Sequence, residues 1–360
     1  MYLLGFGDDG GCMAVVMKPG AGEEDIERVV RFVREKYGLR VDVSRGEFQT
    51  VIGLIGDEDK VDFERLATLP GVERAYRITS PYRLVSRNFF PEDKIIEVKG
   101  VKIGGNNRPI FVAGPCAIES KEQIFRIARE VYEAGADILR GGAFKPRTSV
   151  HSFQGLGEEG LEYLARAGEE YGMPTISEVR SEKHVELVAK YVDILQIGAR
   201  NMYNQDLIEE AARKKKPILL KRSFGASIEE FLSFAERAAA QGNKDIILCE
   251  RGILPIGRGR QFTRYSLDLS AVPVIKKETY LPIIVDPSHG TGRKDLIYPM
   301  SKAAIAAGAH GLMIEVHYNP DEALSDGPQM ITPSELKKII DVCKKIYAIN
   351  YIEGQRHTPP

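Results

Sequence analysis

The sequence is poor in cysteine, has no tryptophan and contains no long apolar run. Its four cysteines lie far apart, which is typical of a reducing compartment and excludes a disulfide framework. No stretch of about 18 apolar residues occurs, so we expect no membrane span. The first 11 residues lack the basic start and the small-residue cleavage site of a signal peptide. The sequence therefore predicts a cytoplasmic protein.

An excess of charge of either sign is also missing. The 50 lysines and arginines are balanced by 51 aspartates and glutamates, for a formal net charge of −1 at pH 7. Binding to nucleic acid depends mainly on neutralising phosphates with lysine and arginine, so this balance predicts no nucleic-acid partner. With 43% hydrophobic and 28% charged residues, the composition is that of an ordinary globular protein. Anionic metabolites fit this balance if basic side chains converge in one pocket.

Residues 12–79 predict a small domain. Apolar residues recur at helical spacing in two stretches, and the other apolar stretches have the length and alternation of strands. The expected strands are 12–17, 39–43, 50–55 and 72–78, and the expected helices are 26–37 and 61–69. The order βαββαβ is that of a ferredoxin-like domain.

A second, larger domain is expected at residues 94–350, after a linker at 80–93 that carries two prolines and no apolar period. It begins with a predicted hairpin at 94–105. Eight apolar strand patterns then follow, each succeeded by a helical pattern, at 110–113, 137–140, 175–178, 194–197, 217–221, 245–249, 282–285 and 311–316. Eight consecutive βα units predict the α/β class and a (β/α)8 TIM barrel, whose parallel strands are buried on both faces.

Charged and metal-binding side chains recur where the predicted barrel strands end. In a TIM barrel the active site forms at the carboxyl ends of the strands. One such residue alone is more often a solvated loop charge, but recurrence at nearly every strand end predicts a polar active site, because these side chains are rarely buried without partners. The residues are Cys116, Glu119, Arg140, Lys145, Glu178, Arg200, Lys221, Glu250, Arg251, Asp286, His289, Glu315 and His317.

The segments around these residues carry a family resemblance. They occur in the order and spacing of 3-deoxy-D-arabino-heptulosonate 7-phosphate (DAHP) synthases, and they read GPCAIES, KPRTS, QIGARN, KR, ERG, DPSHG, EVH and LSDG. The chain resembles the branch of that family with a ferredoxin-like regulatory domain. The resemblance implies a metal-dependent, aldol-type condensation of phosphoenolpyruvate with erythrose 4-phosphate, the first step of the shikimate pathway to the aromatic amino acids.

The resemblance also implies one divalent metal ion per subunit, with Cys116, His289, Glu315 and Asp326 as ligands. A thiolate, an imidazole and two carboxylates form a mixed site that accepts manganese, iron, cobalt or zinc, and the sequence does not choose between them. Taken alone, Cys116 reads equally well as a small buried apolar residue. His317 lies on the same side of its strand as Glu315 and is a candidate neighbour of the metal site.

Further residues are assigned to substrates by the same resemblance. Phosphoenolpyruvate, with its carboxylate and its phosphate, is expected to contact Arg140, Lys145, Ala199, Arg200, Lys221 and Arg251. The phosphate of erythrose 4-phosphate is expected to contact Arg147, Thr148 and Ser149. Catalysis is assigned to Cys116, Lys145 and His289. A lysine that forms an imine is an alternative, although the anionic partners favour ion pairing, and the general acid and base stay open.

An effector is expected in the small domain. In the family branch, tyrosine or phenylalanine binds between the regulatory domains of a homo-oligomer, commonly a tetramer, and inhibits the enzyme. The matching segment includes Asp42 and Ser44. Asp42 stands where related enzymes carry histidine, so the identity of the effector stays open.

Two other functions compete with this interpretation. The sister enzyme 3-deoxy-octulosonate 8-phosphate synthase shares the barrel and a similar metal set, but its substrate loop reads K-A-N-R-S-S where this chain has KPRTS. A catalytically inactive, amino-acid-sensing protein is the second alternative. All the residues assigned to the metal and the anions are present, which favours an enzyme.

Overall fold

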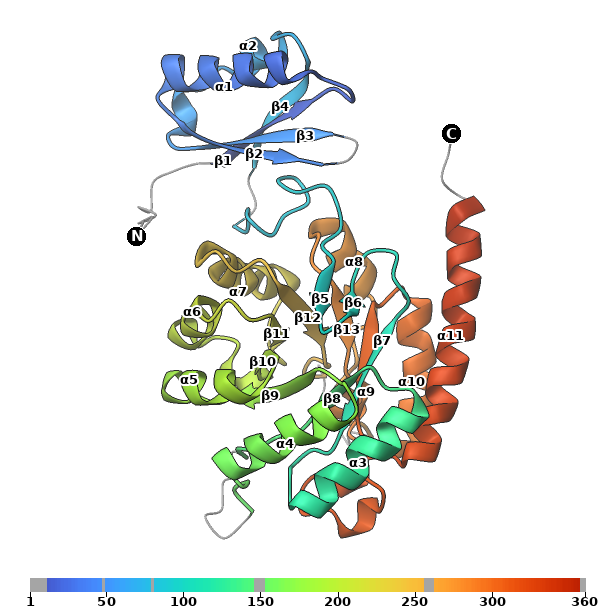
Figure 1. Ribbon diagram of the computed structural model, residues 1–360. Helices are drawn as coiled ribbons and strands as arrows, with labels where there is room; N and C mark the ends of the chain where they lie inside the picture. The colour runs from blue at the N-terminus through green and yellow to red at the C-terminus, as the bar shows by residue number, and fades with distance from the viewer. Residues whose placement is uncertain (1–11, 47–48, 79–80, 146–152, 256–261, 357–360) are drawn as a thin grey trace. The chain divides into compact units, whose positions relative to one another are not determined.

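The computed structural model describes residues 12–46, 49–78, 81–145, 153–255 and 262–356. These residues form two compact units, of which the first comprises the chain up to Asp93 together with Glu278–Tyr280, and the second comprises the rest (Figure 1). In the described part, no helix combines the length and the apolar character that crossing a membrane requires.

The first unit contains a four-stranded antiparallel sheet with the order β2-β3-β1-β4. The strands are β1 (Cys12–Met17), β2 (Arg40–Arg45), β3 (Thr50–Ile55) and β4 (Val72–Ile78), and the helices α1 (Glu23–Tyr37) and α2 (Phe63–Ala67) cover one face. The helix α1 has acidic residues in its first turn and ends at Gly38, which is left-handed and donates its N–H to Arg34 O, as a helix terminus favours. This is the predicted ferredoxin-like fold.

The other face of this sheet is covered by the segment after β4, which the sequence predicts as a linker. Phe89 is 1% exposed and packs with Ala14 and Val51 of the sheet. Its ring lies directly against Gly53, where a Cβ atom would come within 2.0 Å of it. A side chain at residue 53 would therefore displace Phe89, and the described part of 80–93 is folded against the sheet.

The second unit is a closed barrel of eight parallel strands in the order β7 to β14, in which β14 pairs with β7. The strands are β7 (Ile110–Gly114), β8 (Ile138–Arg140), β9 (Thr175–Val179), β10 (Ile194–Ile197), β11 (Ile218–Lys221), β12 (Ile246–Glu250), β13 (Ile283–Val285) and β14 (Gly311–Glu315). The helices are α3 (Lys121–Ala134), α4 (Glu158–Glu170), α5 (Glu182–Tyr191), α6 (Gln205–Arg213), α7 (Ile228–Ala240), α8 (Ala271–Glu278), α9 (Pro287–Thr291), α10 (Lys294–Ala306) and α11 (Pro333–Arg356). The structure thus confirms the predicted TIM barrel.

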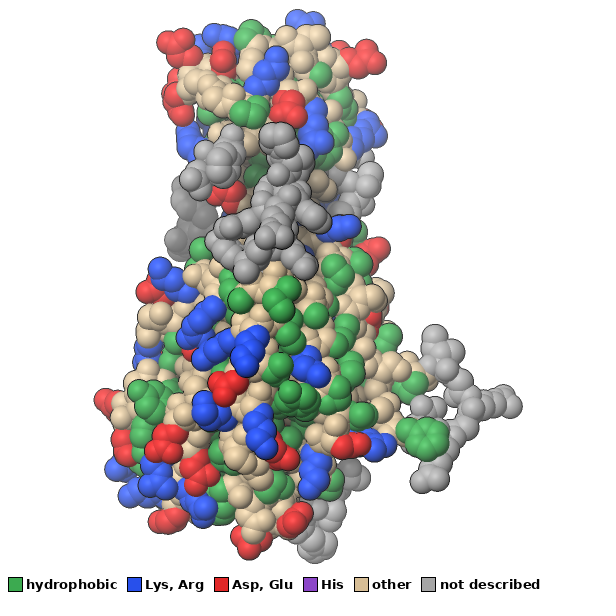
Figure 2. All heavy atoms as spheres, turned by 90° about the vertical axis from the view of Figure 1, so that its right-hand side faces the viewer, with side chains coloured by type: hydrophobic (Ala, Val, Ile, Leu, Met, Phe, Trp, Pro, Cys, Tyr) green, Lys and Arg blue, Asp and Glu red, His purple; other side chains and the backbone are tan. Residues whose placement is uncertain are grey.

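The amino end of the barrel is filled by apolar side chains. A hairpin of β5 (Ile96–Val98) and β6 (Val101–Ile103) turns at Lys99 and Gly100, which both have positive φ angles of 47° and 82°. Its buried residues belong to the same core cluster as the first residues of the barrel strands, such as Ile110. The polar residues are left at the opposite, carboxyl end. On the outer face that Figure 2 shows, basic and acidic side chains are interspersed with apolar ones.

Candidate active site at the carboxyl ends of the barrel strands

A cavity of about 250 Å³ lies at the carboxyl ends of the barrel strands. Two of its lining residues are acidic, Glu178 and Asp326. The basic lining residues outnumber them and are Arg140, Lys145, Arg200, Lys221, Arg251 and Arg264. Several cations around a small volume repel one another unless an anion lies between them, so this wall indicates an anionic ligand.

The structure brings all six residues predicted for phosphoenolpyruvate to this one cavity, namely Arg140, Lys145, Ala199, Arg200, Lys221 and Arg251. They come from the ends of four strands, β8, β10, β11 and β12, or from the loops that follow them. Lys145 also donates from Nζ to the carbonyl oxygen of Cys116 at 2.7 Å. The residues predicted for the aldose, Arg147, Thr148 and Ser149, lie outside the described residues.

Arg251 and its neighbour in space Arg222 have different partners. Arg251 is 5% exposed, and its Nη1 has no hydrogen-bond partner among the residues that the structure describes. Its guanidinium lies over the ring of Tyr265, 4.1 Å from the centroid. Arg222 Nη1, in contrast, pairs with Glu250 at 3.0 Å and with Asp268 at 2.9 Å. Arg251 is therefore the buried cation with donor capacity left for a ligand.

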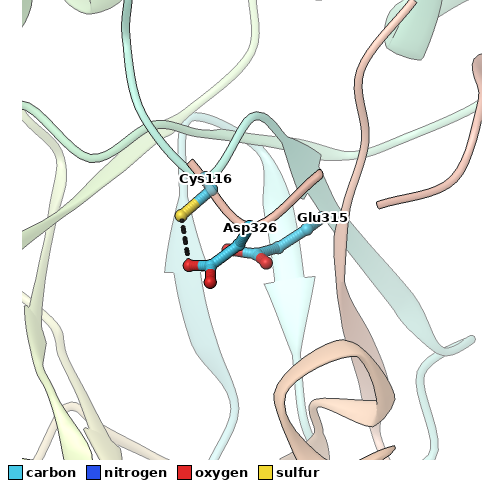
Figure 3. Close-up of side chains that lie close together, drawn as sticks. All are labelled: Cys116, Glu315 and Asp326. Carbon is cyan, nitrogen blue, oxygen red and sulfur yellow. Dashed lines mark hydrogen bonds between the residues drawn. The ribbon is translucent and has the colours of Figure 1, made fainter. Parts of the chain in front are cut away.

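Three predicted metal ligands lie together beside the cavity. The ligand atoms of Cys116, Glu315 and Asp326 are all within 4.8 Å of one another (Figure 3). Cys116 follows β7, Glu315 ends β14, and Asp326 lies in the loop after β14 with a left-handed φ of 54°. This φ is uncommon outside glycine but is tolerated by aspartate, and it turns the Asp326 side chain toward Cys116 Sγ at 3.0 Å.

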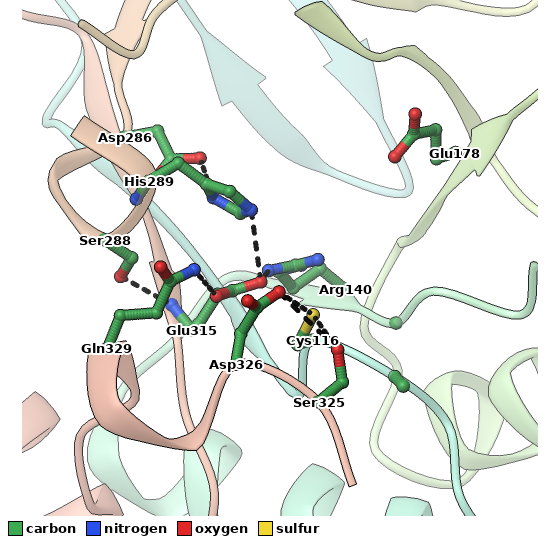
Figure 4. A network of polar contacts seen from close by, with 12 residues as sticks. Cys116, Arg140, Glu178, Asp286, Ser288, His289, Glu315, Ser325, Asp326 and Gln329 are labelled. Carbon is green, nitrogen blue, oxygen red and sulfur yellow. Dashed lines mark hydrogen bonds and ion pairs between the residues drawn. The ribbon is translucent and has the colours of Figure 1, made fainter. Parts of the chain in front are cut away.

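The fourth predicted ligand, His289, lies on α9 with its Nε2 3.5 Å from Glu315 Oε1 (Figure 4). Its other ring nitrogen, Nδ1, is 2.8 Å from Asp286 Oδ2. The second oxygen of Asp286 accepts the His289 backbone N–H at 2.9 Å and so caps the helix. A carboxylate on one imidazole nitrogen orients the other nitrogen toward the cluster, as is typical of histidines that bind metals.

Two buried carboxylates of the site are held ionised by their neighbours. Burial alone raises the pKa of Glu315, but the charges of His289 and Arg140 outweigh it and hold the pKa well below its ordinary value. Arg140 Nη1 lies 2.6 Å from Glu315 Oε1. Burial likewise opposes ionisation of Asp286, and His289 and Lys221, with Lys221 Nζ at 2.5 Å, keep the pKa of that carboxyl low.

The thiol in the cluster behaves in the opposite way. Burial, followed by the negative charge of Glu315, raises the pKa of Cys116 to about 12. The protonated Cys116 Sγ donates a hydrogen bond to Asp326 Oδ2 at 3.0 Å. Cys116, Glu315 and Asp326 could hold a divalent cation, which would require the thiol to ionise and would offset the negative charge of the two carboxylates. The set of a thiol, two carboxylates and a neighbouring imidazole fits a divalent transition metal.

Comparison with protein families decides the assignment. A model described as the DAHP synthetase I family matches residues 91–349. The chain belongs to the DAHP synthetase I family. A second model, described as the DAHP synthase ferredoxin-like domain, matches residues 13–80. The resemblance that the sequence motifs indicated is thereby confirmed, and the chain is an enzyme of this family.

Individual relatives agree with the family. A protein of Thermotoga maritima named phospho-2-dehydro-3-deoxyheptonate aldolase is 50% identical over 334 residues, which cover 93% of this chain and 97% of the relative. A crystal structure of a protein of that name from the same organism matches with a TM-score of 0.74 at 48% identity, covering 95% of this chain and 98% of that chain. A 2-dehydro-3-deoxyphosphooctonate aldolase of Geotalea uraniireducens is 31% identical over 274 residues, which cover 71% of this chain and 98% of the relative.

Other residues that sequence patterns singled out lie elsewhere. His317 Nδ1 accepts the Asn319 backbone N–H at 3.0 Å, and its Nε2 faces Glu119 at 4.0 Å. This histidine is therefore not part of the cluster of Cys116, Glu315 and Asp326. Asp42 is exposed and Ser44 is half-buried, and both lie on the edge strand β2. Glu178 lines the cavity but lies apart from the cluster in Figure 4.

Sequence reasoning missed several residues of the site. Arg264, Tyr265 and Phe224 line the cavity, and Gln329 contacts Glu315. Site residues were predicted from the positions directly after each predicted barrel strand. The segment at 264–265 does not follow a barrel strand directly, so it was not identified. Gln329 lies three residues after Asp326 and two residues beyond the LSDG motif, and that short spacing was the signal available in the sequence.

Proposed function

We propose that the protein is a 3-deoxy-7-phosphoheptulonate synthase, which condenses phosphoenolpyruvate with erythrose 4-phosphate and releases phosphate. Membership of the DAHP synthetase I family supports this proposal. The observation that carries it is the cavity with six basic side chains, which also meets the thiol and carboxylate cluster at Asp326. A doubly anionic substrate and a metal-assisted carbonyl reaction both fit such an arrangement.

The residues around the cavity divide into two groups in this proposal. Arg200, Lys221 and Arg251 bind the phosphate of phosphoenolpyruvate, and Arg140 and Lys145 lie on the side of its carboxylate. Cys116, His289, Glu315 and Asp326 hold one divalent ion of manganese, iron, cobalt or zinc. When bound, the ion supplies a Lewis acid that polarises an aldehyde oxygen.

The reaction adds C3 of phosphoenolpyruvate to the aldehyde carbon of erythrose 4-phosphate. Positive charge then develops at C2 and is quenched by water, and the resulting hemiketal phosphate loses inorganic phosphate by cleavage of its C–O bond. The cations on the cavity wall keep both anionic groups of phosphoenolpyruvate in place throughout. Glu178, on the cavity wall, is a candidate to position the water.

Phosphate release with each aldose phosphate tests the proposal and separates it from the octulosonate alternative. Erythrose 4-phosphate is expected to give a much higher kcat/KM than arabinose 5-phosphate. Arg147→Ala should lower kcat/KM for the aldose about 10–100-fold, because a charge-assisted hydrogen bond contributes about 1.5–3 kcal/mol. Arg166→Ala, a change of an exposed residue on α4, is the control. Preference for arabinose 5-phosphate would show that the chain is the sister enzyme.

We also propose that the first unit senses an aromatic amino acid, tyrosine or phenylalanine, near Asp42 and Ser44 in a homo-oligomer, which we expect to be a tetramer. A chain that begins at Lys94 is expected to release phosphate normally and to lose inhibition, because every residue proposed for catalysis lies at or after Cys116. A solved truncated form of the Thermotoga maritima synthase, which matches 76% of this chain with a TM-score of 0.70, supports the design.

Paired inhibition curves of the full and truncated proteins, with each amino acid in turn, measure this effect. Inhibition that persists in the truncated protein would place the effector site in the barrel. No response in either protein would show that a chain with Asp42 does not use these effectors.

A further inference from the structure

We propose that Gln329 is a positioning residue of the active site, which, supported by Arg264, fixes the orientation of the Glu315 carboxylate. The inference rests on the proposed function in one respect, because it takes Glu315 as a metal ligand. It concerns side chains whose contacts are all in the described part of the structure.

Gln329 uses both ends of its side-chain amide. It is 4% exposed, its Nε2 donates to Glu315 Oε2, and its Oε1 accepts from Arg264 Nη1 at 3.1 Å. The orientation of the amide follows from its neighbours, because a guanidinium only donates and an ionised carboxylate only accepts. A glutamine in this place satisfies both, whereas a glutamate or an apolar side chain would fail one or both.

The two oxygens of Glu315 have different partners. Oε1 lies 2.6 Å from Arg140 Nη1 and 3.5 Å from His289 Nε2, and Oε2 accepts from Gln329 (Figure 4). The last torsion of a glutamate side chain is broad, so packing alone leaves the plane of its carboxylate poorly defined. A donor on each oxygen selects one orientation, and Gln329 is the donor on the second oxygen.

Gln329 is also tied to the second carboxylate of the cluster. It ends the short 3-10 helix η4 (Gly327–Gln329), which begins directly after Asp326. Its backbone N–H donates to Asp326 O at 3.1 Å. The main chain of Gln329 thus stabilises the turn that presents Asp326, and its side chain holds Glu315, so one residue sets the relative position of the two carboxylates.

Arg264 comes from a different loop and is itself well placed to hold Gln329. Its backbone N–H donates at 2.9 Å to the carbonyl oxygen of Thr291, the last residue of α9. A Cβ atom on Gly292 would come within 2.7 Å of the Arg264 Cβ, so the close approach of the two segments depends on this glycine. The guanidinium polarises the amide of Gln329 and strengthens its N–H as a donor to Glu315.

Metal affinity tests this role by a measurement other than turnover. Binding of Co²⁺ to wild type and Gln329→Met is measured by competition with a chelator, and the visible spectrum of the bound ion reports its ligand geometry. Outer hydrogen-bond partners of metal ligands typically contribute 10–100-fold in affinity, so we expect Gln329→Met to bind about 10–100-fold more weakly, with a changed spectrum. Gln329→Glu, which cannot donate and adds a negative charge, is expected to change the spectrum as well.

The matched control is Gln241→Met. The Gln241 amide also donates to a glutamate carboxylate, Glu209 at 3.3 Å, but at the end of α7, away from the carboxyl ends of the strands. The Gln241→Met protein is expected to bind Co²⁺ with the affinity of the wild type. Arg264→Met tests whether Arg264 acts through Gln329. Made in the wild type, it should weaken Co²⁺ binding. Made in Gln329→Met, it should have no further effect, because mutations of residues in contact do not have additive effects.

Each outcome decides between the hypotheses. Equal Co²⁺ affinity and spectrum for wild type and Gln329→Met would overturn the positioning role and leave the proposed function in place. Additive effects of the Arg264 and Gln329 changes would overturn the part that Arg264 plays. A wild type that does not bind Co²⁺ would overturn the inference together with the proposed metal site. Circular dichroism checks the fold, and if Gln329→Met does not fold, the shorter Gln329→Asn decides in its place.

Discussion

Removal of the metal ion is expected to abolish phosphate release, and addition of a divalent transition metal to restore it. Cys116→Ala should lower kcat about 100-fold or more even with metal present, because the variant removes one of the four proposed metal ligands. The fold should persist, since only one buried sulfur atom is lost. Cys343→Ala, which removes another buried thiol on α11, is the control and should keep full activity.

Phosphate release by metal-stripped protein in excess chelator measures the dependence. Full activity under these conditions would contradict the metal site. The thiol adds a second check: because burial raises the pKa of Cys116 to about 12, an ion that binds at neutral pH has to displace a proton. Apparent metal affinity is therefore expected to rise with pH, and a pH indicator should register proton release on binding.

Arg251→Met is expected to impair the use of phosphoenolpyruvate about 10²–10⁴-fold in kcat/KM. Arg251 is buried with unused donors, and two charge-assisted hydrogen bonds at about 1.5–3 kcal/mol each give that range. The KM for erythrose 4-phosphate should change much less. Steady-state kinetics with each substrate varied in turn measure the difference, and an unchanged KM for phosphoenolpyruvate would remove Arg251 from the anion site.

Arg222→Met is the matched variant, because Arg222 is equally buried but already paired with Glu250 and Asp268. Breaking a buried pair leaves an uncompensated charge and destabilises a protein by about 3–5 kcal/mol. We therefore expect Arg222→Met to lower the melting temperature. Arg251→Met, which removes one of several like charges that line the cavity, should not lower it. Of the two neighbouring arginines, Arg251 would then contribute to the binding of phosphoenolpyruvate and Arg222 to the stability of the fold.

The sequence by itself determined the two folds and most of the anion site. Helical and strand periods are local properties of the chain, and eight βα units in succession leave few architectures besides a barrel. Once a barrel is assumed, the carboxyl ends of all strands meet at one end. Residues such as Arg140, Lys221 and Arg251 could therefore be assigned to one site from their position in the sequence alone.

Only the tertiary structure decided which of these residues are paired and which are available. Asp286 pairs with Lys221, which lies 65 residues away in the sequence. Glu315 pairs with Arg140, which lies 175 residues away. No local pattern shows that Arg222 is neutralised and that Arg251 is not, because both follow apolar strands. The packing of Phe89 on Gly53 and the contact of Gln329 with Glu315 likewise depend on how distant segments approach. Such contacts form only when the sheet forms and the barrel closes. They depend on the distances between residues in the folded protein, which cannot be read from the spacing of those residues in the sequence.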